Sequence, residues 1–376
     1  MCPEIVLSEA VGSDHRYPKR TLSSCEIFES KVYQIDPLAD PRWERFVERH
    51  SRSSVFHSIP WLRALRETYG YRPIAFTTSG PSEELTNGVP LCEIDSWLTG
   101  RRMVSLPFSD YCEILCDKKS DLKLILRRLQ EEIETKRWRY VEIRPVEHAQ
   151  AFGRPFVSYT LHRVDLTPDL ATLFANLHYS SIQRKILRAE REQLEYVEGA
   201  NATLLDSFYG LLAVTRRRHR VPPQPRSWFR ALLRHFGENL KIRLALKDGM
   251  SIAGIVTIRH KDTLYYKYGG SDAHFHRLGG MHLLYWRAIQ DAKTAGLKVF
   301  DLGRSDLDQP GLIKFKSRWG SSVSELDYVR KASEQVTHLF ESGGSSFRTR
   351  LARTVFAHTP ISILSAFGDL LYKHVG

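Results

Sequence analysis

Residues 263–303 constrain the fold of this 376-residue chain more than any other stretch. They begin with the strand-like run TLYYKYGGS, pass through the loop DAHFHRLGG into the helical run MHLLYWRAIQDAKTAG, and end in the strand-like run LKVFDLG. A strand, a glycine-containing loop, a helix and a second strand predict one α/β unit. The runs KIRLALKDG and SIAGIVTIRHKD precede it as two further strands with Asp-Gly and Lys-Asp turns.

The rest of the chain repeats this order of elements without a visible sequence repeat. Between residues 31 and 155 the patterns run strand, helix, strand, strand, helix, strand, and they include the apolar run YCEILCD as a strand and a helical stripe at Leu122, Leu124, Ile125, Leu129 and Ile133. A single long helical stretch is predicted at 170–193. The length favours two domains. We expect a mixed α/β (α+β) fold with a loose tail at 1–30, domains at 31–155 and 156–330, and a helical tail at 331–376.

Composition restricts the compartment and the partners. The chain has no 18-residue apolar run, no basic segment followed by a long apolar run at its start, and five cysteines without C-x-x-C spacing. We therefore expect a cytoplasmic protein in a reducing compartment, without a structural disulfide framework. The net charge of +12 favours anionic partners, although scattered solvated charge is the alternative. The amphipathic run at 347–376 is expected to dock on the protein, and contact with the inner face of an anionic membrane is the alternative.

The loop before the predicted helix at 281–296 is the best candidate for a ligand site. Free N–H groups and a positive dipole end lie at the start of a helix, and glycine lets a phosphate approach the backbone. Gly279 and Gly280 could thus hold a pyrophosphate with help from Arg277, unless Gly-Gly forms an ordinary turn. Strands that diverge on either side of this helix would leave a slot for an extended, pantetheine-like acyl carrier.

Four blocks of the chain resemble a known family. They are FHSIPWLRAL, SSIQRKILRAER, the stretch from YYKYGGS to FDLGRSD, and GLIKFKSRWG. The chain resembles the Fem-type (FemAB-like) branch of the GNAT superfamily, which includes peptidoglycan-bridge aminoacyltransferases and CelD/BcsL-type acetyltransferases of exopolysaccharide clusters. The resemblance implies tandem GNAT-like domains around a cleft and acyl transfer to an amine. It implies acyl-CoA or aminoacyl-tRNA as donor, and cell-envelope precursors on a nucleotide or lipid phosphate as acceptors.

Candidate catalytic residues follow from this resemblance. Lys316 matches the family's Phe-Lys lysine and could stabilise an oxyanion; Lys314 would face the same side if the segment were extended. Asp301 and Asp110 are alternative bases, and each could instead belong to a turn. The donor side is assigned to Arg277, Gly279, Gly280, Met281 and Tyr268. The substrate side is assigned to Arg304, Tyr111, Arg184, Lys185, Arg188 and Phe315.

Three functional hypotheses remain open from the sequence. The first is an acyltransferase that moves an acyl group from acyl-CoA, such as acetyl-CoA, to an amine or hydroxyl of a cell-envelope or exopolysaccharide precursor. The second is an aminoacyl-tRNA-dependent transferase of the peptidoglycan-bridge kind, and the third is a non-catalytic protein that binds a glycan or lipid carrier. The absence of H-E-x-x-H and G-x-S-x-G predicts no catalytic metal and no acyl-serine intermediate. The sequence does not distinguish a monomer from a dimer.

Overall fold

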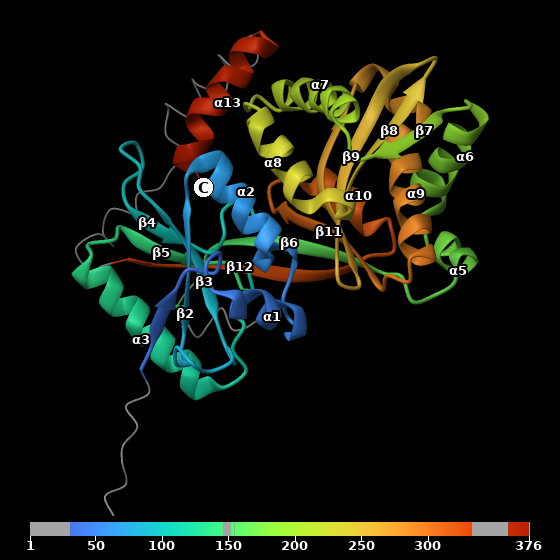
Figure 1. The fold of residues 1–376 in the computed structure, drawn as a ribbon. Coiled ribbons are helices and arrows are strands. Elements are labelled where there is room, and N and C mark those ends of the chain that lie inside the picture. Colours follow the sequence, from blue (N-terminus) through green and yellow to red (C-terminus); the bar gives the residue numbers. More distant parts are fainter. Residues whose placement is uncertain (1–30, 146–151, 154, 333–359, 376) are drawn as a thin grey trace, which may run out of the picture. The chain divides into compact units, whose positions relative to one another are not determined.

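A computed structural model describes residues 31–145, 152–153, 155–332 and 360–375, which belong to one compact unit (Figure 1). The tail predicted at 1–30 and residues 333–359 of the helical tail predicted at 331–376 lie outside these residues. No helix in the described part of the chain is long and apolar enough to cross a membrane.

One mixed sheet runs through the described residues. Its first strands are β1 (Tyr33–Ile35), β2 (Arg72–Thr77), β3 (Val89–Ile94), β4 (Arg102–Val104) and β5 (Tyr140–Ile143). The sheet continues, in spatial order, with β12 (Ser322–Ala332), β6 (Pro155–Asp165), β11 (Val299–Asp306), β10 (Thr263–Ser271), β9 (Met250–His260), β8 (Leu240–Lys247) and β7 (Glu195–Gly199). β12 pairs with β5 on one edge and with β6 on the other, so the last strand of the described residues joins the two halves of the sheet. The predicted mixed α/β class is confirmed.

Helices cover both faces of the first five strands. The predicted stripe on α3 (Lys119–Thr135) buries Leu122, Ile125, Leu129 and Ile133 against β2, β3 and β5, and Leu124 is half-buried. α1 (Pro41–Arg49) and α2 (Ile59–Tyr69) cover the other face. Asp40 caps α1 and the left-handed Gly70 ends α2, in agreement with the predicted boundary at that glycine.

The second half of the sheet is also covered on both faces. α7 (Ala202–Arg218) and α8 (Arg226–Phe236) pack with the first core, while α6 (Arg184–Arg191) and α9 (Gly280–Thr294) pack with the second (Figure 1). The Trp61 ring of α2 meets the Trp228 ring of α8 edge-on at 5.1 Å, so the first core spans both halves of the sequence.

Two predicted elements differ in the structure, and a segment whose conformation was left open is helical. The helical stretch at 170–193 is broken into α5 (Leu170–Ala175), a π-helical turn (Tyr179–Gln183) and α6, because the Gln183 side-chain amide caps the carbonyls of Phe174 and Leu177. The run YCEILCD is not a strand: only Leu115 makes a bridge, to Gly88. Its sequence has the apolar character of a buried strand, but the left-handed φ of Leu106 and Phe108 turns the preceding backbone. The Phe-Lys segment is helical, in α10 (Pro310–Ser317), because Pro310 fits the first helical turn.

The C-terminal helix α13 (Ile361–Val375) is docked on the protein. The Tyr71 hydroxyl donates to the carbonyl of Tyr372 at 3.0 Å, and the Arg102 guanidinium donates to the carbonyl of His374 at 2.8 Å. The expectation that the C-terminal amphipathic run docks on the protein is therefore confirmed for residues 361–375. The preceding part of that run, before residue 360, lies outside the described residues.

Candidate active site

The sheet opens between β10 and β11. The two strands pair in parallel only at Thr263↔Val299, Leu264↔Phe300 and Tyr265↔Asp301. Beyond these pairs β10 stays with β9 as far as Ser271, and β11 stays with β6 as far as Asp306. The predicted divergence of the two strands is confirmed, and the last paired residue of β11 is the candidate Asp301.

A bulge in each strand accompanies this split. The register of β10 against β9 shifts between Tyr266 and Tyr268, and that of β11 against β6 shifts between Asp301 and Gly303. Gly303 adopts a φ of 69°, and a Cβ there would lie 3.1 Å from the Asp110 carboxylate. Glycine thus allows the strand to bend where a first-half loop approaches it closely.

Lys316 reaches the split from α10. Its side chain is 3% exposed, and its ammonium donates to the carbonyls of Gly303 at 3.0 Å and Arg304 at 2.7 Å. An ammonium has three N–H donors, so one remains for a ligand. Burial lowers the pKa of Lys316 to about 8, although the negative charges of Asp110 and Asp301 oppose this shift. Lys314 is exposed, because residues two apart on a helix do not share a face; Lys316 is therefore the lysine that enters the site.

Phe315 positions this lysine. Its ring packs against those of Tyr285 at 5.5 Å and Trp319 at 6.1 Å, which fastens α10 to α9. Phe315 thus supports the site through packing, whereas the sequence assigned it to the substrate.

Asp301 is a buried acceptor at the centre of the site. One carboxylate oxygen accepts from the Tyr111 hydroxyl at 2.9 Å and from Arg163 Nε at 3.2 Å, and the other accepts from the Gly303 N–H at 2.7 Å. Asp301 is therefore arranged to orient Tyr111 and Arg163. Burial holds the pKa of Tyr111 well above its ordinary value, so this hydroxyl keeps its proton.

Asp110 is paired with a lysine that the sequence analysis did not select. Its carboxylate accepts from the Lys267 ammonium at 2.9 Å, and that ammonium lies 5.0 Å from the Phe56 ring centre and 5.6 Å from that of Trp61. Burial lowers the pKa of Lys267, and Asp110 partly offsets the shift. The available signal was a lysine inside the apolar strand pattern YYKYGG. Arg163, from β6, was also missed.

Arg304 follows the split on β11. Its guanidinium lies 3.9 Å from the ring centre of Tyr159, and it approaches Asp306 at 3.7 Å. The Arg304 side chain is thus held by Tyr159 and Asp306. Among the described residues, the structure shows no contact between Arg304 and the loop at Gly279.

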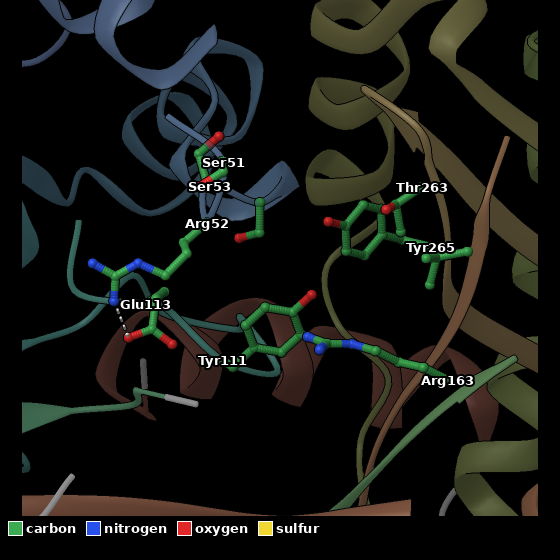
Figure 2. A pocket seen from close by; sticks show the side chains of 10 residues that line it. Ser51, Arg52, Ser53, Tyr111, Glu113, Arg163, Thr263 and Tyr265 are labelled. Carbon is green, nitrogen blue, oxygen red and sulfur yellow. Dashed lines mark ion pairs between the residues drawn. The ribbon is translucent and has the colours of Figure 1, made fainter. Parts of the chain in front are cut away.

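A cavity of about 270 Å³ adjoins Asp301 on the side of Tyr111 and Arg163 (Figure 2). Its wall includes Ser51, Arg52, Ser53, Ser54, Tyr111, Glu113, Arg163, Thr263, Tyr265 and Val299. Arg52 and Glu113 approach each other at 3.8 Å, and Tyr111 and Arg163, which both donate to the buried Asp301, lie beside each other in the cavity wall. The cavity is thus polar, carries both signs of charge and lies next to the strand split.

The glycines before α9 are used for packing. A Cβ on Gly279, whose φ is 84°, would lie 2.3 Å from the carbonyl oxygen of Lys185 in α6, and a Cβ on Gly280 would lie 3.1 Å from the Cβ atom of Ala253. These glycines therefore let α6 and the sheet approach the start of α9. Met281 packs against the second core beside them, and Arg277 is exposed.

Tyr268 lies away from this loop. Its ring is in the first core and its hydroxyl accepts from the Trp228 indole at 2.8 Å. The bulge between Tyr266 and Tyr268 breaks the alternation of the strand, so Tyr265 and Tyr268 both face the first core while Tyr266 packs with the second. Tyr268 is thus not brought together with Arg277.

Cations gather on the outer face of α6 and around it. Arg184 and Arg191 flank a shallow hollow with Leu187 and Glu190, and Arg188 pairs with Glu192 at 3.4 Å. The carbonyl of Arg318, at the end of α10, accepts from the His178 N–H at 3.0 Å, which brings α10 beside the start of the π-helical turn. Within the described ranges, Arg184, Lys185, Arg191, Arg277, Lys314 and Arg318 have no carboxylate within ion-pair distance.

The comparisons with known proteins agree with this architecture. Residues 178–317 match the model of an acetyltransferase (GNAT) domain. The chain is 28% identical over 159 residues to a UDP-N-acetylmuramoylpentapeptide-lysine N(6)-alanyltransferase of Weissella viridescens, a match of 41% of this chain and 46% of the relative. The matched region thus spans less than half of that relative's length.

Solved structures extend the likeness to most of the fold. The crystal structure of FemX superposes with a TM-score of 0.64 at 16% identity, covering 83% of this chain and 100% of FemX. A tandem GNAT protein from the clavulanic acid biosynthesis pathway superposes with a TM-score of 0.50 at 10% identity, covering 80% of this chain and 98% of that protein. At these identities the likeness concerns the fold, which is tandem GNAT-like as predicted.

Proposed function

Because this chain belongs to the GNAT superfamily of acyltransferases and has a tandem GNAT-like fold, we propose that it transfers an aminoacyl group from aminoacyl-tRNA to an amine of a peptidoglycan precursor. One observation carries the proposal: the split between β10 and β11 meets a buried lysine with a hydrogen-bond donor to spare. An acyl group that enters the split comes within reach of Lys316. The non-catalytic hypothesis gives no reason to bury an ammonium at this point.

The residues around the site favour aminoacyl-tRNA as the acyl donor. The space that a side chain at Gly279 or Gly280 would occupy is taken by the Lys185 carbonyl and the Ala253 side chain, so these glycines serve packing, and this weakens the case for a phosphate cradle there. Arg184, Lys185, Arg191 and Arg277, with Lys314 and Arg318 of α10, have no acidic partner among the described residues, and such unpaired cations suit a polynucleotide backbone. The alanyltransferase relative also supports an aminoacyl donor. Acyl-CoA remains the second candidate donor, since the strand split and the acetyltransferase domain model favour it.

The acceptor is proposed to enter from the cavity beside Asp301. The cavity wall contains hydroxyl groups, the carboxylate of Glu113 and the guanidiniums of Arg52 and Arg163. These groups can bind the charged groups of an amino-acid side chain and of the acceptor atoms beside it. The name of the relative suggests a lysine amine on a muramoyl-pentapeptide, carried on a nucleotide or a lipid phosphate. Tyr111 and Arg163, both held by Asp301, would then direct the amine toward the split.

Direct attack is the simplest chemistry for this arrangement. The neutral amine nitrogen forms a bond to the ester carbonyl carbon, and Lys316 stabilises the negative charge on the carbonyl oxygen. The ester C–O bond then breaks and the amine proton passes to the departing hydroxyl oxygen. Asp301 and Asp110 are both engaged by donors, so we assign them to positioning. Holding the two substrates together supplies much of the acceleration.

Radiolabelled donors can test this function. The purified chain would be incubated with UDP-N-acetylmuramoyl-pentapeptide and either alanyl-tRNA or acetyl-CoA, and the labelled acceptor would be quantified by chromatography. The proposal expects transfer from alanyl-tRNA and little from acetyl-CoA. Transfer from acetyl-CoA alone would select the second candidate donor. No transfer from either donor to nucleotide-linked or lipid-linked acceptor would refute the proposed reaction.

A further inference from the structure

Arg163 presents part of its guanidinium to the cavity beside Asp301. Its side chain belongs to the cavity wall and is 36% exposed. Its Nε–H donates to the Asp301 carboxylate at 3.2 Å, and Asp301 is its one carboxylate partner in the part of the chain that the structure describes. That bond uses one of the five N–H donors of a guanidinium, so donors remain for a ligand in the cavity.

The fold fixes the direction of this guanidinium before a ligand binds. The guanidinium lies 5.0 Å from the ring centre of Tyr111, and the Tyr111 hydroxyl donates to the same Asp301 oxygen. Figure 2 shows the Arg163 side chain pointing toward Tyr111. The backbone of Arg163 pairs with Asp301 of β11 on one side and with Ser322 of β12 on the other. A ligand thus meets a group of donors that is already ordered, which favours binding.

The other charged groups of the cavity wall are directed toward each other. Glu113 is 4% exposed, and its carboxylate approaches Arg52 at 3.8 Å. Arg52 also donates to the Asp117 carboxylate at 2.7 Å and to the Cys116 carbonyl at 2.9 Å. Arg163 is therefore the cation of this wall that suits an incoming anion best.

The charges at the split suit a ligand with one negative charge. Lys267 pairs with Asp110 at 2.9 Å, and Arg163 pairs with Asp301 at 3.2 Å. Lys316 instead donates to two carbonyls and, among the residues described, has no carboxylate within ion-pair distance. Its ammonium therefore adds a positive charge that these pairs do not cancel. A carboxylate on the ligand would balance this charge, and charges attract strongly where little water is present.

The place of Arg163 along the sheet indicates which carboxylate it meets. Asp301, its partner across β6 and β11, is the last residue of β11 that pairs with β10, and the opposite residue Tyr265 belongs to the cavity wall. An amine that reaches the split from the cavity thus lies next to Arg163 with its last atoms. A carboxylate within reach of Arg163 at that moment is one on the carbon that carries the amine. A lysine side chain has no such group.

We propose that Arg163 binds a carboxylate on the carbon that carries the attacking amine. The acceptor is then a diamino dicarboxylic acid residue of the precursor peptide, whose far end is itself an α-amino acid. The amine nitrogen bonds to the aminoacyl carbonyl carbon, the ester C–O bond breaks, the amine proton passes to the departing hydroxyl oxygen, and the carboxylate is left unchanged. This inference rests on the proposed function and deepens it by naming the class of acceptor.

Binding of two nucleotide-linked peptides tests the inference apart from catalysis. Isothermal titration calorimetry would compare UDP-N-acetylmuramoyl-pentapeptides that carry meso-diaminopimelate or L-lysine as the third residue, which differ by this carboxylate. The wild type should bind the diaminopimelate form about tenfold tighter or more, because a charged hydrogen bond is lost with lysine. Arg163→Gln should bind both forms with about the wild-type affinity for the lysine form.

Two further variants control this comparison. Lys298→Gln removes a cation that is 68% exposed and directly precedes the cavity residue Val299, and it should keep the wild-type preference. Arg163→Lys keeps the charge but lacks the planar group of donors, so the preference should fall to about two- to threefold. Far-ultraviolet circular dichroism and thermal unfolding show whether each variant is folded.

Transfer from alanyl-tRNA to the same two peptides separates this inference from the proposed function. We expect kcat/KM to favour the diaminopimelate form by a similar factor, mainly through KM. Transfer to neither peptide would refute the proposed function, while a calorimetric preference that Arg163→Gln abolishes would still support the contact. Equal or tighter wild-type binding of the lysine form, binding of neither peptide, or an Arg163→Gln variant that weakens both peptides by the same factor would overturn the inference.

Discussion

Replacing Lys316 with methionine should stabilise the folded chain. Burial lowers the pKa of this ammonium from an ordinary 10.5 to about 8. A shift of that size corresponds to about 3 kcal/mol of unfavourable ionisation in the folded state at pH 7. Methionine removes this cost but leaves the carbonyls of Gly303 and Arg304 without the lysine donor, a loss of about 1 kcal/mol each. The variant should therefore be about 1–2 kcal/mol more stable than the wild type at pH 7.

The pH dependence makes this prediction specific. Between pH 8 and 10.5 the unfolded lysine keeps its proton while the folded lysine loses it, so the unfolded state binds more protons and wild-type stability rises with pH. From pH 7 to pH 9.5 this contribution amounts to about 2 kcal/mol. Urea unfolding at both pH values, for the wild type, Lys316→Met and the exposed-lysine control Lys314→Met, measures it. A Lys316→Met protein that is less stable at pH 7, or whose stability follows the same pH course as the wild type, would refute this reasoning.

Three further changes have defined outcomes. In steady-state kinetics, kcat/KM should fall above about pH 8, because the protonated Lys316 needed for the oxyanion is lost there; a rate that rises through this range would mean that the neutral lysine acts as a base. Gly279→Ala should cost roughly 2–4 kcal/mol in urea unfolding, since a Cβ would meet the Lys185 carbonyl at a φ of 84°, and an unchanged midpoint would contradict the packing role. Asp301→Asn should lower kcat/KM by about a hundredfold while the protein stays folded by circular dichroism, because Tyr111 and Arg163 lose a charged acceptor; near wild-type kinetics would remove Asp301 from the site.

Local sequence patterns predicted much of the fold. Alternation in residues 240–271 and the helical period in residues 280–294 gave the strands and the crossover helix correctly, and Gly70 ended its helix as expected. The strand split was also predictable, because the glycines at the end of β10 and in β11 suit bent backbone.

Contacts between distant segments explain what the sequence could not predict. Lys267 can be recognised as a site residue only from its ion pair with Asp110, which is distant in the sequence. Arg163 can be recognised only from the pairing of β6 with β11, which brings it to Asp301. In the sequence, Gly279 before a helix suggests an anion site. In the structure, the close approach of Lys185 in α6 gives this glycine a packing role. Tyr268 was assigned to the donor side, but a bulge in β10 places its side chain in the first core.

The rate of acyl transfer in a single turnover tests the central claim most directly. With enzyme in excess of alanyl-tRNA and acceptor saturating, the account predicts that Lys316→Met slows transfer by about 10²–10³-fold, while Lys314→Met on the same helix transfers at the wild-type rate. Equal rates for wild type and Lys316→Met would contradict a transfer centre at the split between β10 and β11.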